Sequence, residues 1–197
     1  MATKEEGFRN LTAGELRITR TVFKDAINYG MVKVYNGEYI PFGMQYDSTA
    51  VTPNGNMYWP KKIFKEDFSS QSPEIQNWFI HEMTHVWQYQ MGMNVRTRGA
   101  MSWAANYEYW LPDYKTLANF NMEQQAGIVA DYFTLERFGI NSWMRAKDFK
   151  GIVGPDLKKK YQNALKYFLY HRATGNVYGT EIIFFQLNCF IISWVWT

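Results

Sequence analysis

The chain has 197 residues, of which 47% are hydrophobic and 18% aromatic, and its formal net charge is +3 at pH 7. This length and composition are typical of one domain with a sizeable core, so we expect residues 1–197 to form a single domain rather than two. The net charge is small and the basic runs are short, which argues against nucleic acid as a partner. The single Cys189 excludes an intramolecular disulfide.

The first predicted element is a helix after Thr12. Thr12 is a good N-cap, Glu15 three residues later completes a capping box, and apolar residues follow near helical spacing. Two hairpins are predicted next, MVKVY with EYIPF around Asn36-Gly37 and STAVTP with NMYWP around Asn54-Gly55, because Asn-Gly favours tight hairpin turns. We therefore expect a small sheet, antiparallel or mixed and mostly antiparallel.

A long helix is predicted from Pro73 to about Gln90. Ser72 is a plausible N-cap, Pro73 suits the first helical position, and Glu74 lies at the positive end of the helix dipole. Gly92 is placed to end the helix. These local signals make the segment between them a helix with defined ends.

The most informative motif, HExxH at residues 81–85, lies inside this predicted helix. Histidines four positions apart lie about 40° apart around a helix, so His81 and His85 can bind one divalent metal from the same face. Glu82 lies beside that metal, where a general base is needed to take a proton from water. The motif therefore predicts a Zn²⁺ site that still lacks its third ligand.

A second long helix, from the N-cap Asn121 to Gly139, is the predicted source of that ligand. When two histidines on one helix bind zinc, the third ligand commonly comes from the next helix. Glu123, in the first turn, is the favoured candidate. Asp131 lies eight residues on, about 80° around the helix. Asp131 is therefore predicted to support a histidine as a neighbouring carboxylate and remains the alternative ligand.

An irregular stretch rich in Trp, Tyr and Asn, residues 91–118, is predicted to separate the two long helices and to form one wall of a cleft. A further helix is predicted from Pro155 to about His171. Residues 182–196 are strongly apolar but too short a run to cross a bilayer, so we expect a buried terminal strand or helix and no transmembrane helix.

Stabilisation of a tetrahedral intermediate needs a further hydrogen-bond donor near the metal. His171, the one histidine outside the motif, is a candidate. A tyrosine phenol can serve equally, and Tyr114, nine residues before Glu123, is the first choice. Tyr107, Tyr109 and Tyr132 are the alternatives.

Four separated segments resemble a known family: LTAGEL from residue 11, VTPNGNMYWP from residue 51, FIHEMTHVWQYQMG from residue 79 and FNMEQQAGIVADYF from residue 120. HEMTH on one helix followed by EQQAGIVADYF on the next resembles the gluzincin group of zincin metallopeptidases. More narrowly, the four segments look like bacterial zinc peptidases known as Vgr-related or Rhs-associated, which are linked to type VI secretion. The resemblance spans about residues 11–139 and assigns no role to the apolar tail at residues 180–197.

The resemblance implies an α+β, zincin-like fold, with a small sheet on the HExxH helix, then a ligand-bearing helix and a C-terminal helix. It implies Zn²⁺ held by His81, His85 and Glu123, with Glu82 as general base and a peptide or protein as substrate. It also implies Vgr- or Rhs-type secretion proteins as partners, and export by a type VI system of an effector or processing protease.

Two other functions stay open. A non-enzymatic accessory or adaptor of a secretion system would use zinc only to hold its helices together, and such structural sites usually have four protein ligands. A membrane-acting protein would depend on its apolar tail. The N-terminal MATKEEGFRN has no apolar run that would direct general secretion, so we expect synthesis and folding in the cytoplasm.

Overall fold

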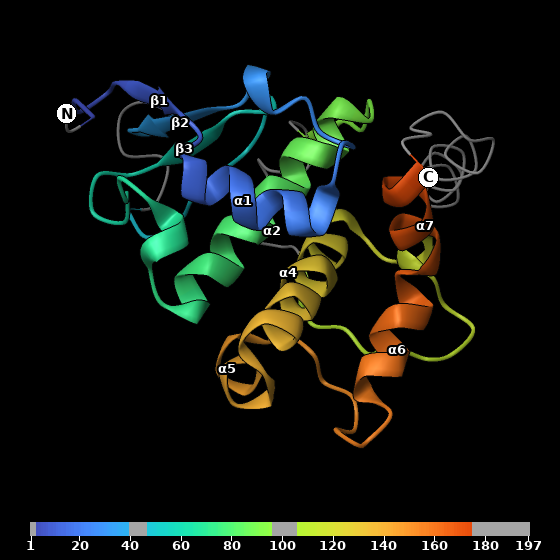
Figure 1. The fold of residues 1–197 in the computed structure, drawn as a ribbon. Coiled ribbons are helices and arrows are strands. Elements are labelled where there is room, and N and C mark those ends of the chain that lie inside the picture. Colours follow the sequence, from blue (N-terminus) through green and yellow to red (C-terminus); the bar gives the residue numbers. More distant parts are fainter. Residues whose placement is uncertain (1–2, 40–46, 96–105, 175–197) are drawn as a thin grey trace, which may run out of the picture.

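A computed structural model describes residues 3–39, 47–95 and 106–174, and the side chains of residues 171–174 lie outside this description. Within these ranges the fold is α+β, with a small sheet at one end and the two long helices α2 (Pro73–Gln90) and α4 (Met122–Phe138) side by side in the middle (Figure 1). The remaining helices are α1 (Ala13–Phe23), α5 (Ile140–Ala146), α6 (Leu157–Ala164) and α7 (Lys166–Thr174).

The sheet is mixed rather than mostly antiparallel. β1 (Phe8–Asn10) runs antiparallel to β2 (Lys33–Asn36), whereas β2 runs parallel to β3 (Met57–Trp59). The hairpin predicted after β2 is wrong in the described residues. The chain beyond β2 stays paired with β3, because the backbone N–H of Gly37 donates to Trp59 O at 2.9 Å. Residues 40–42 of its expected second strand lie outside the described residues.

The second hairpin is present as a short bridge. Val51 and Tyr58 form an antiparallel pair, with N–H to O distances of 3.1 and 2.9 Å. Gly55 in the connecting turn has φ of 78°, a conformation that favours glycine. This pairing places residues 49–53 beside the edge of β3, on the way to the HExxH helix.

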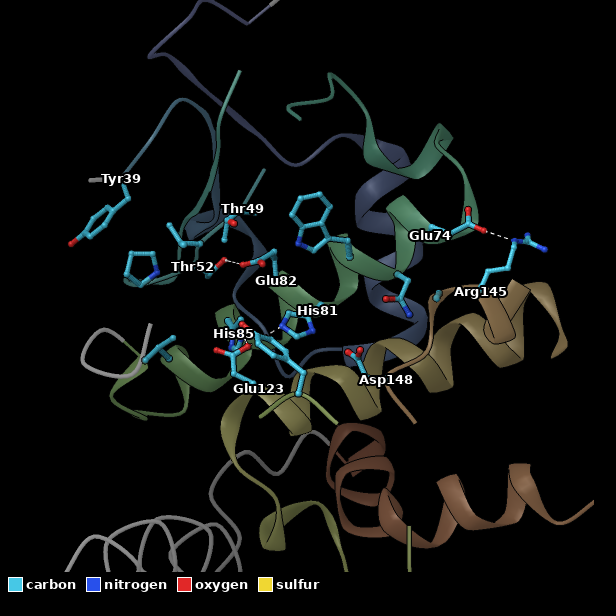
Figure 2. A pocket seen from close by; sticks show the side chains of 18 residues that line it. Tyr39, Thr49, Thr52, Glu74, His81, Glu82, His85, Glu123, Arg145 and Asp148 are labelled. Atoms are coloured by element: carbon cyan, nitrogen blue, oxygen red, sulfur yellow. Dashed lines mark hydrogen bonds and ion pairs between the residues drawn. The ribbon is translucent and has the colours of Figure 1, made fainter. Parts of the chain in front are cut away.

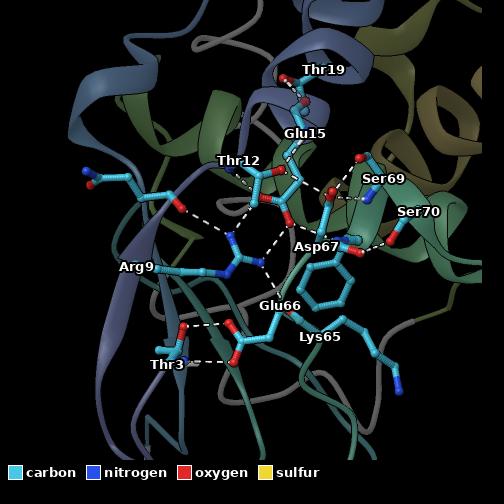
Figure 3. Close-up of polar contacts among 12 residues, drawn as sticks. Thr3, Arg9, Thr12, Glu15, Thr19, Lys65, Glu66, Asp67, Ser69 and Ser70 are labelled. Carbon is cyan, nitrogen blue, oxygen red and sulfur yellow. Dashed lines mark hydrogen bonds and ion pairs between the residues drawn. The ribbon is translucent and has the colours of Figure 1, made fainter. Parts of the chain in front are cut away.

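The N-terminal strand is fixed to the rest of the fold by a buried ion pair (Figure 3). Both Nη atoms of Arg9 donate to the carboxylate of Glu15 at 2.7 Å, and Glu15 is fully buried. The same carboxylate accepts from the backbone N–H groups of Thr12 and Phe68 at 2.9 Å. Glu15 therefore does more than cap α1, because it also ties β1 and α1 to the turn that leads into α2.

The three long predicted helices begin where the capping residues indicated. Thr12 and Glu15 form the expected capping box on α1, the Ser72 hydroxyl caps α2, and Asn121 caps α4. Gly139 ends α4 with φ of 78°. The ends of these helices were predictable because capping is local.

The C-terminal part differs from its prediction in two places. α5 follows Gly139 directly and was not predicted. The single helix expected from Pro155 to His171 is two helices, α6 and α7, which meet at the buried Leu165. The apolar tail lies outside the described residues, and among those described no helix is both long and apolar enough to span a membrane.

Aromatic side chains fill the core on both sides of the helix pair. Trp59, Phe68 and Phe79 pack between the sheet and α2. Trp59 is tilted against Phe68 at 4.2 Å between ring centroids, and Phe68 stacks on Phe79 at 5.1 Å. On the far side of α4, Trp143 and Tyr161 pack edge to face and share a hydrogen bond of 3.0 Å. α2 and α4 are thus packed on both faces, which fixes the side chains that they present to each other.

Candidate metal site

The HExxH helix brings its two histidines to one place. His81 and His85 lie one turn apart on α2, and their ring centroids are 4.9 Å apart. His85 is buried and His81 is partly exposed. The histidine pair is therefore accessible from one side only.

Glu123 completes the cluster from the first turn of α4. Its Oε2 lies 3.2 Å from Nε2 of His81 and 3.1 Å from Nε2 of His85 (Figure 2). The three donor atoms all lie within 4.8 Å of one another. Of the two carboxylates considered from the sequence, the structure brings Glu123, and not Asp131, to the histidines.

This cluster fits a zinc ion by its chemistry and by its spacing. Two imidazoles and a carboxylate are a ligand set that catalytic zinc uses. Donor atoms at about 2.0–2.1 Å from zinc stand roughly 3.3 Å apart in a tetrahedron, close to the 3.1 and 3.2 Å between Glu123 Oε2 and the two imidazoles. Two of the three donor separations therefore already suit zinc, and all three donors lie within 4.8 Å of one another.

The charges within the cluster show why a cation is favoured there. Burial opposes ionisation of Glu123, but the charges and hydrogen bonds of the two histidines outweigh it and lower the pKa of Glu123 well below its ordinary value. Burial also lowers the pKa of His85, but the Glu123 carboxylate raises it more strongly, to about 9. Without metal, a proton on His85 offsets the carboxylate, and a metal ion would take the place of that proton.

A chain of buried amides fixes the orientation of the His85 ring. The backbone carbonyls of Phe120 and Met122 can only accept, so the amide nitrogens of Gln125 and Gln88 must face them, at 2.9 and 3.1 Å. The Gln88 oxygen then faces Nδ1 of His85 at 2.7 Å. Nδ1 must therefore carry a proton, which leaves Nε2 to face Glu123 as a ligand.

Gln88 was missed in the sequence analysis. The signal was a polar residue three positions after the second histidine, within a helix whose neighbouring residues are buried. Its role depends on Gln125 and on the backbone of the next helix, which no local pattern reveals.

Glu82 lies on the cleft side of α2, next to the histidines. It is 4% exposed, and its Oε2 accepts a hydrogen bond of 2.6 Å from the hydroxyl of Thr52. Thr52 belongs to the segment that pairs with β3, so the sheet edge holds the carboxylate of Glu82 in place. Thr52 is a second residue that sequence analysis did not identify.

The cluster opens into a cleft of about 460 Å³. Figure 2 shows the cleft from close by, with Thr49 and Thr52 on one side of the histidines and Asp148, Arg145 and Glu74 on the other. The lining residues are Tyr39, Thr49, Ala50, Val51, Thr52, Pro53, Glu74, Asn77, Trp78, His81, Glu82, His85, Val95, Tyr107, Glu123, Arg145, Ala146 and Asp148.

Among the candidate oxyanion donors, the structure brings Tyr107 to the cleft. The Tyr107 ring lies 6.2 Å from the His81 ring, and burial together with Glu123 and Glu82 raises the pKa of its phenol. Tyr114, the first choice from the sequence, is 81% exposed and does not line the cleft. Spacing along an irregular stretch does not determine which way its tyrosines face.

The other candidates do not reach the cleft in the described residues. Tyr109 is buried below it, and Tyr132 stacks on Tyr161 in the core. His171 belongs to α7, but its side chain lies outside the described residues.

Asp131 supports the cleft floor rather than a histidine, so its predicted contact is wrong. In the described structure its carboxylate accepts from Asn77 Nδ2 at 3.1 Å, from the Tyr109 hydroxyl at 2.5 Å and from the backbone N–H of Asp148 at 3.0 Å. Burial raises its pKa to about 7, although these hydrogen bonds lower it. Asn77, four residues before His81 on α2, occupies the position facing Asp131 that was predicted for a histidine.

Comparisons with known proteins agree on one relative. The type VI secretion system spike protein VgrG2b of Pseudomonas aeruginosa is 40% identical over 156 residues, which cover 75% of this chain and 15% of the spike protein. The solved effector domain of that VgrG2b is 34% identical, with a TM-score of 0.60, over 76% of this chain and 89% of the domain. The chain belongs to the VgrG2b effector-domain family. No model of a protein family matches the sequence.

The VgrG2b relative is a spike protein of a type VI secretion system, which supports the link that the sequence resemblance implied. This chain spans only the effector part of the VgrG2b spike protein, at 15% of its length. The narrower prediction, that the chain is a zincin metallopeptidase, remains a prediction that depends on the HExxH residues and Glu123.

Proposed function

We propose that the protein is a zinc-dependent peptidase that acts as a type VI secretion effector. The observation that carries the proposal is the convergence of His81, His85 and Glu123 next to Glu82, at the floor of an open cleft. Bound zinc would polarise the carbonyl of the scissile peptide bond and lower the pKa of a water molecule. Membership of the VgrG2b effector-domain family supports the role as an effector.

Glu82 is the general base in this proposal. Its carboxylate takes a proton from water as the water oxygen adds to the carbonyl carbon, and passes that proton to the amide nitrogen as the C–N bond breaks. The hydrogen bond from Thr52 holds one carboxylate oxygen, so that the other can face the substrate. The phenol of Tyr107, which lines the cleft, donates to the carbonyl oxygen in this proposal as that oxygen gains charge.

The cluster argues against the accessory or adaptor role. A structural zinc site usually has four protein ligands, whereas the metal-binding group in the described residues comprises three. Its three residues also line the cleft, which leaves one side of the cluster open to a substrate. A fourth protein ligand on the zinc of the purified protein would favour the accessory role instead.

The test compares Glu82→Gln with wild type after loading with zinc. We expect the variant to keep its zinc and its fold, and peptide cleavage to fall by roughly 10²- to 10⁴-fold, because proton transfer is lost. New N-termini in a denatured proteome, identified by mass spectrometry, report the cleavage. Glu136→Gln is the control, since Glu136 is a surface carboxylate of α4 paired with Lys158. Full cleavage by Glu82→Gln would overturn the assignment.

The role as a toxic effector needs a separate experiment. If the chain is an effector, its cleavage activity should harm cells that receive it. We expect growth inhibition when wild type is produced in a susceptible bacterium, directed to the cytoplasm or to the periplasm, and no inhibition by Glu82→Gln at equal protein level. Equal growth inhibition by both proteins would refute a toxic peptidase.

A further inference from the structure

Most charged side chains of the cleft have a hydrogen-bond or ion-pair partner. Glu74 accepts from Arg145 Nε at 2.7 Å, and Glu82 accepts from Thr52. Glu123 is committed to the two histidines. Asp148 is the exception among the described residues, because its carboxylate takes part in no hydrogen bond or ion pair there.

The lysines next to Asp148 form no ion pair with it, because each bonds elsewhere. Lys147 donates to the backbone oxygen of Phe149 at 2.9 Å, and Lys150 forms an ion pair of 3.1 Å with Glu108. Asp148 itself is half-buried, and burial raises the pKa of its carboxyl, although the charges of His81, Lys150 and Lys147 oppose this rise. The described part of the chain thus leaves a partly desolvated carboxylate in the cleft with positive charges nearby but no ion-pair partner in direct contact.

Its backbone is held firmly from below. The N–H of Asp148 donates to the buried carboxylate of Asp131 at 3.0 Å, and its carbonyl accepts from Tyr109 N–H at 3.4 Å. The bridge between Tyr109 and Phe149 continues this pairing. The position of the Asp148 carboxylate is therefore set by a rigid network and not by an exposed loop.

The carboxylate also has a defined place along the cleft. Its Oδ2 lies 3.6 Å from the point where Gly127 would carry a Cβ atom. Gly127 is four residues after Glu123, just over one turn farther along α4, or about 6 Å. For an extended peptide that runs along α4 at about 3.3 Å per residue, the carboxylate faces a residue about two positions from the scissile bond.

We propose that Asp148 selects substrates with a lysine or arginine side chain at one position beside the scissile bond. This inference rests on the proposed peptidase function and adds the substrate class. The ammonium or guanidinium group supplies the missing counterion, and a charge-assisted hydrogen bond in a half-buried site favours the cationic substrate by about 10- to 100-fold.

The first experiment measures cleavage of paired peptides by the zinc-loaded protein. Each pair differs only in lysine or norleucine at one position, scanned across the scissile bond, with arginine and citrulline as a second pair. We expect wild type to prefer the cationic peptide by about 10- to 100-fold at a single position. Asp148→Asn should abolish this preference. Asp148→Arg should instead prefer a peptide with glutamate at that position over the same peptide with lysine. No preference in wild type, or an unchanged preference in Asp148→Asn, overturns the inference.

Glu108→Gln is the matched control. It removes the same charge from the neighbourhood of Asp148, but Glu108 is outside the cleft lining, so the preference should persist. Zinc affinity is measured in parallel. If Asp148→Asn weakened zinc binding in step with the change in selectivity, Asp148 would be positioning His81, and the specificity role would be wrong.

A binding experiment separates this inference from the peptidase proposal. Glu82→Gln and the double variant Glu82→Gln/Asp148→Asn are titrated with fluorescent lysine and norleucine peptides. We expect only the single variant to discriminate between the two peptides. If wild type cleaves nothing while this discrimination remains, the peptidase proposal fails and the cation site stands. If wild type cleaves peptides without discrimination in either assay, the cation site alone fails.

Discussion

Replacing Gln88 with leucine should weaken zinc binding without touching a ligand. Gln88 is fully buried, and its amide oxygen accepts from Nδ1 of His85 at 2.7 Å. Leucine removes this acceptor, so the imidazole is free to rotate or to adopt the other tautomer. Loss of such a supporting hydrogen bond typically costs 10- to 100-fold in metal affinity, or about 1.4–2.7 kcal/mol.

The same substitution has a cost in folding. The Gln88 amide nitrogen donates to Met122 O and to Gln125 Oε1, at 3.1 and 3.0 Å, and leucine leaves these buried acceptors with fewer partners. Each unpaired group costs about 1–3 kcal/mol. Zinc affinity must therefore be measured by competition with a chromophoric chelator at a temperature where circular dichroism shows the variant to be folded.

Two further variants make the result decisive. Gln90→Leu is the control on the same helix, since it removes hydrogen bonds to Asn28 that lead away from the site. Gln88→Glu keeps an acceptor facing His85 and should retain zinc affinity. If Gln88→Leu binds zinc as tightly as wild type and Gln90→Leu, the buried amide chain does not control the ring of His85.

Three further predictions concern the site. Glu123→Ala should lower zinc affinity by more than 10²-fold, because it removes a ligand, and retention of stoichiometric zinc in equilibrium dialysis would contradict this. Tyr107→Phe should keep zinc and lower kcat by about 10²-fold with little change in KM, which steady-state kinetics on one peptide checks; an unchanged kcat would exclude the phenol as the oxyanion donor. In the zinc-free protein the pKa of His85 is raised to about 9, so its contribution to stability is full below about pH 6.5 and is lost as the pH rises through 9. That contribution is on the order of 3 kcal/mol. Urea unfolding at a series of pH values with a chelator present should show this loss. If the free energy of unfolding of the zinc-loaded protein fell equally steeply with pH, the exchange of proton for metal would be wrong.

The features that could be predicted are those that local sequence encodes. Thr12, Ser72 and Asn121 begin helices because a side-chain oxygen caps the backbone within three residues. The HExxH spacing places His81 and His85 on one face by helix geometry alone. Glu123 was favoured for the same reason, as a carboxylate in the first turn of the next helix.

What escaped prediction depends on contacts between distant segments. β1 has only three residues, FRN, too few for a periodic pattern, and it pairs with β2 across a long stretch of chain, with Phe8 opposite Tyr35. The parallel pairing of β2 and β3 likewise has no turn signal. Thr52 and Tyr107 reach the cleft from an edge segment and an irregular stretch, whose side-chain directions only the folded chain defines.

The first turn of α4 holds two parts of the metal site at once. It carries Glu123, and the carbonyls of Phe120 and Met122 at the same place set the ring of His85 through the buried amides. Fraying of this one turn would therefore remove one ligand and release the orientation of another. Metal occupancy and order of the turn are then thermodynamically linked, so zinc should slow amide hydrogen exchange at residues 124–126 more than elsewhere in the helix.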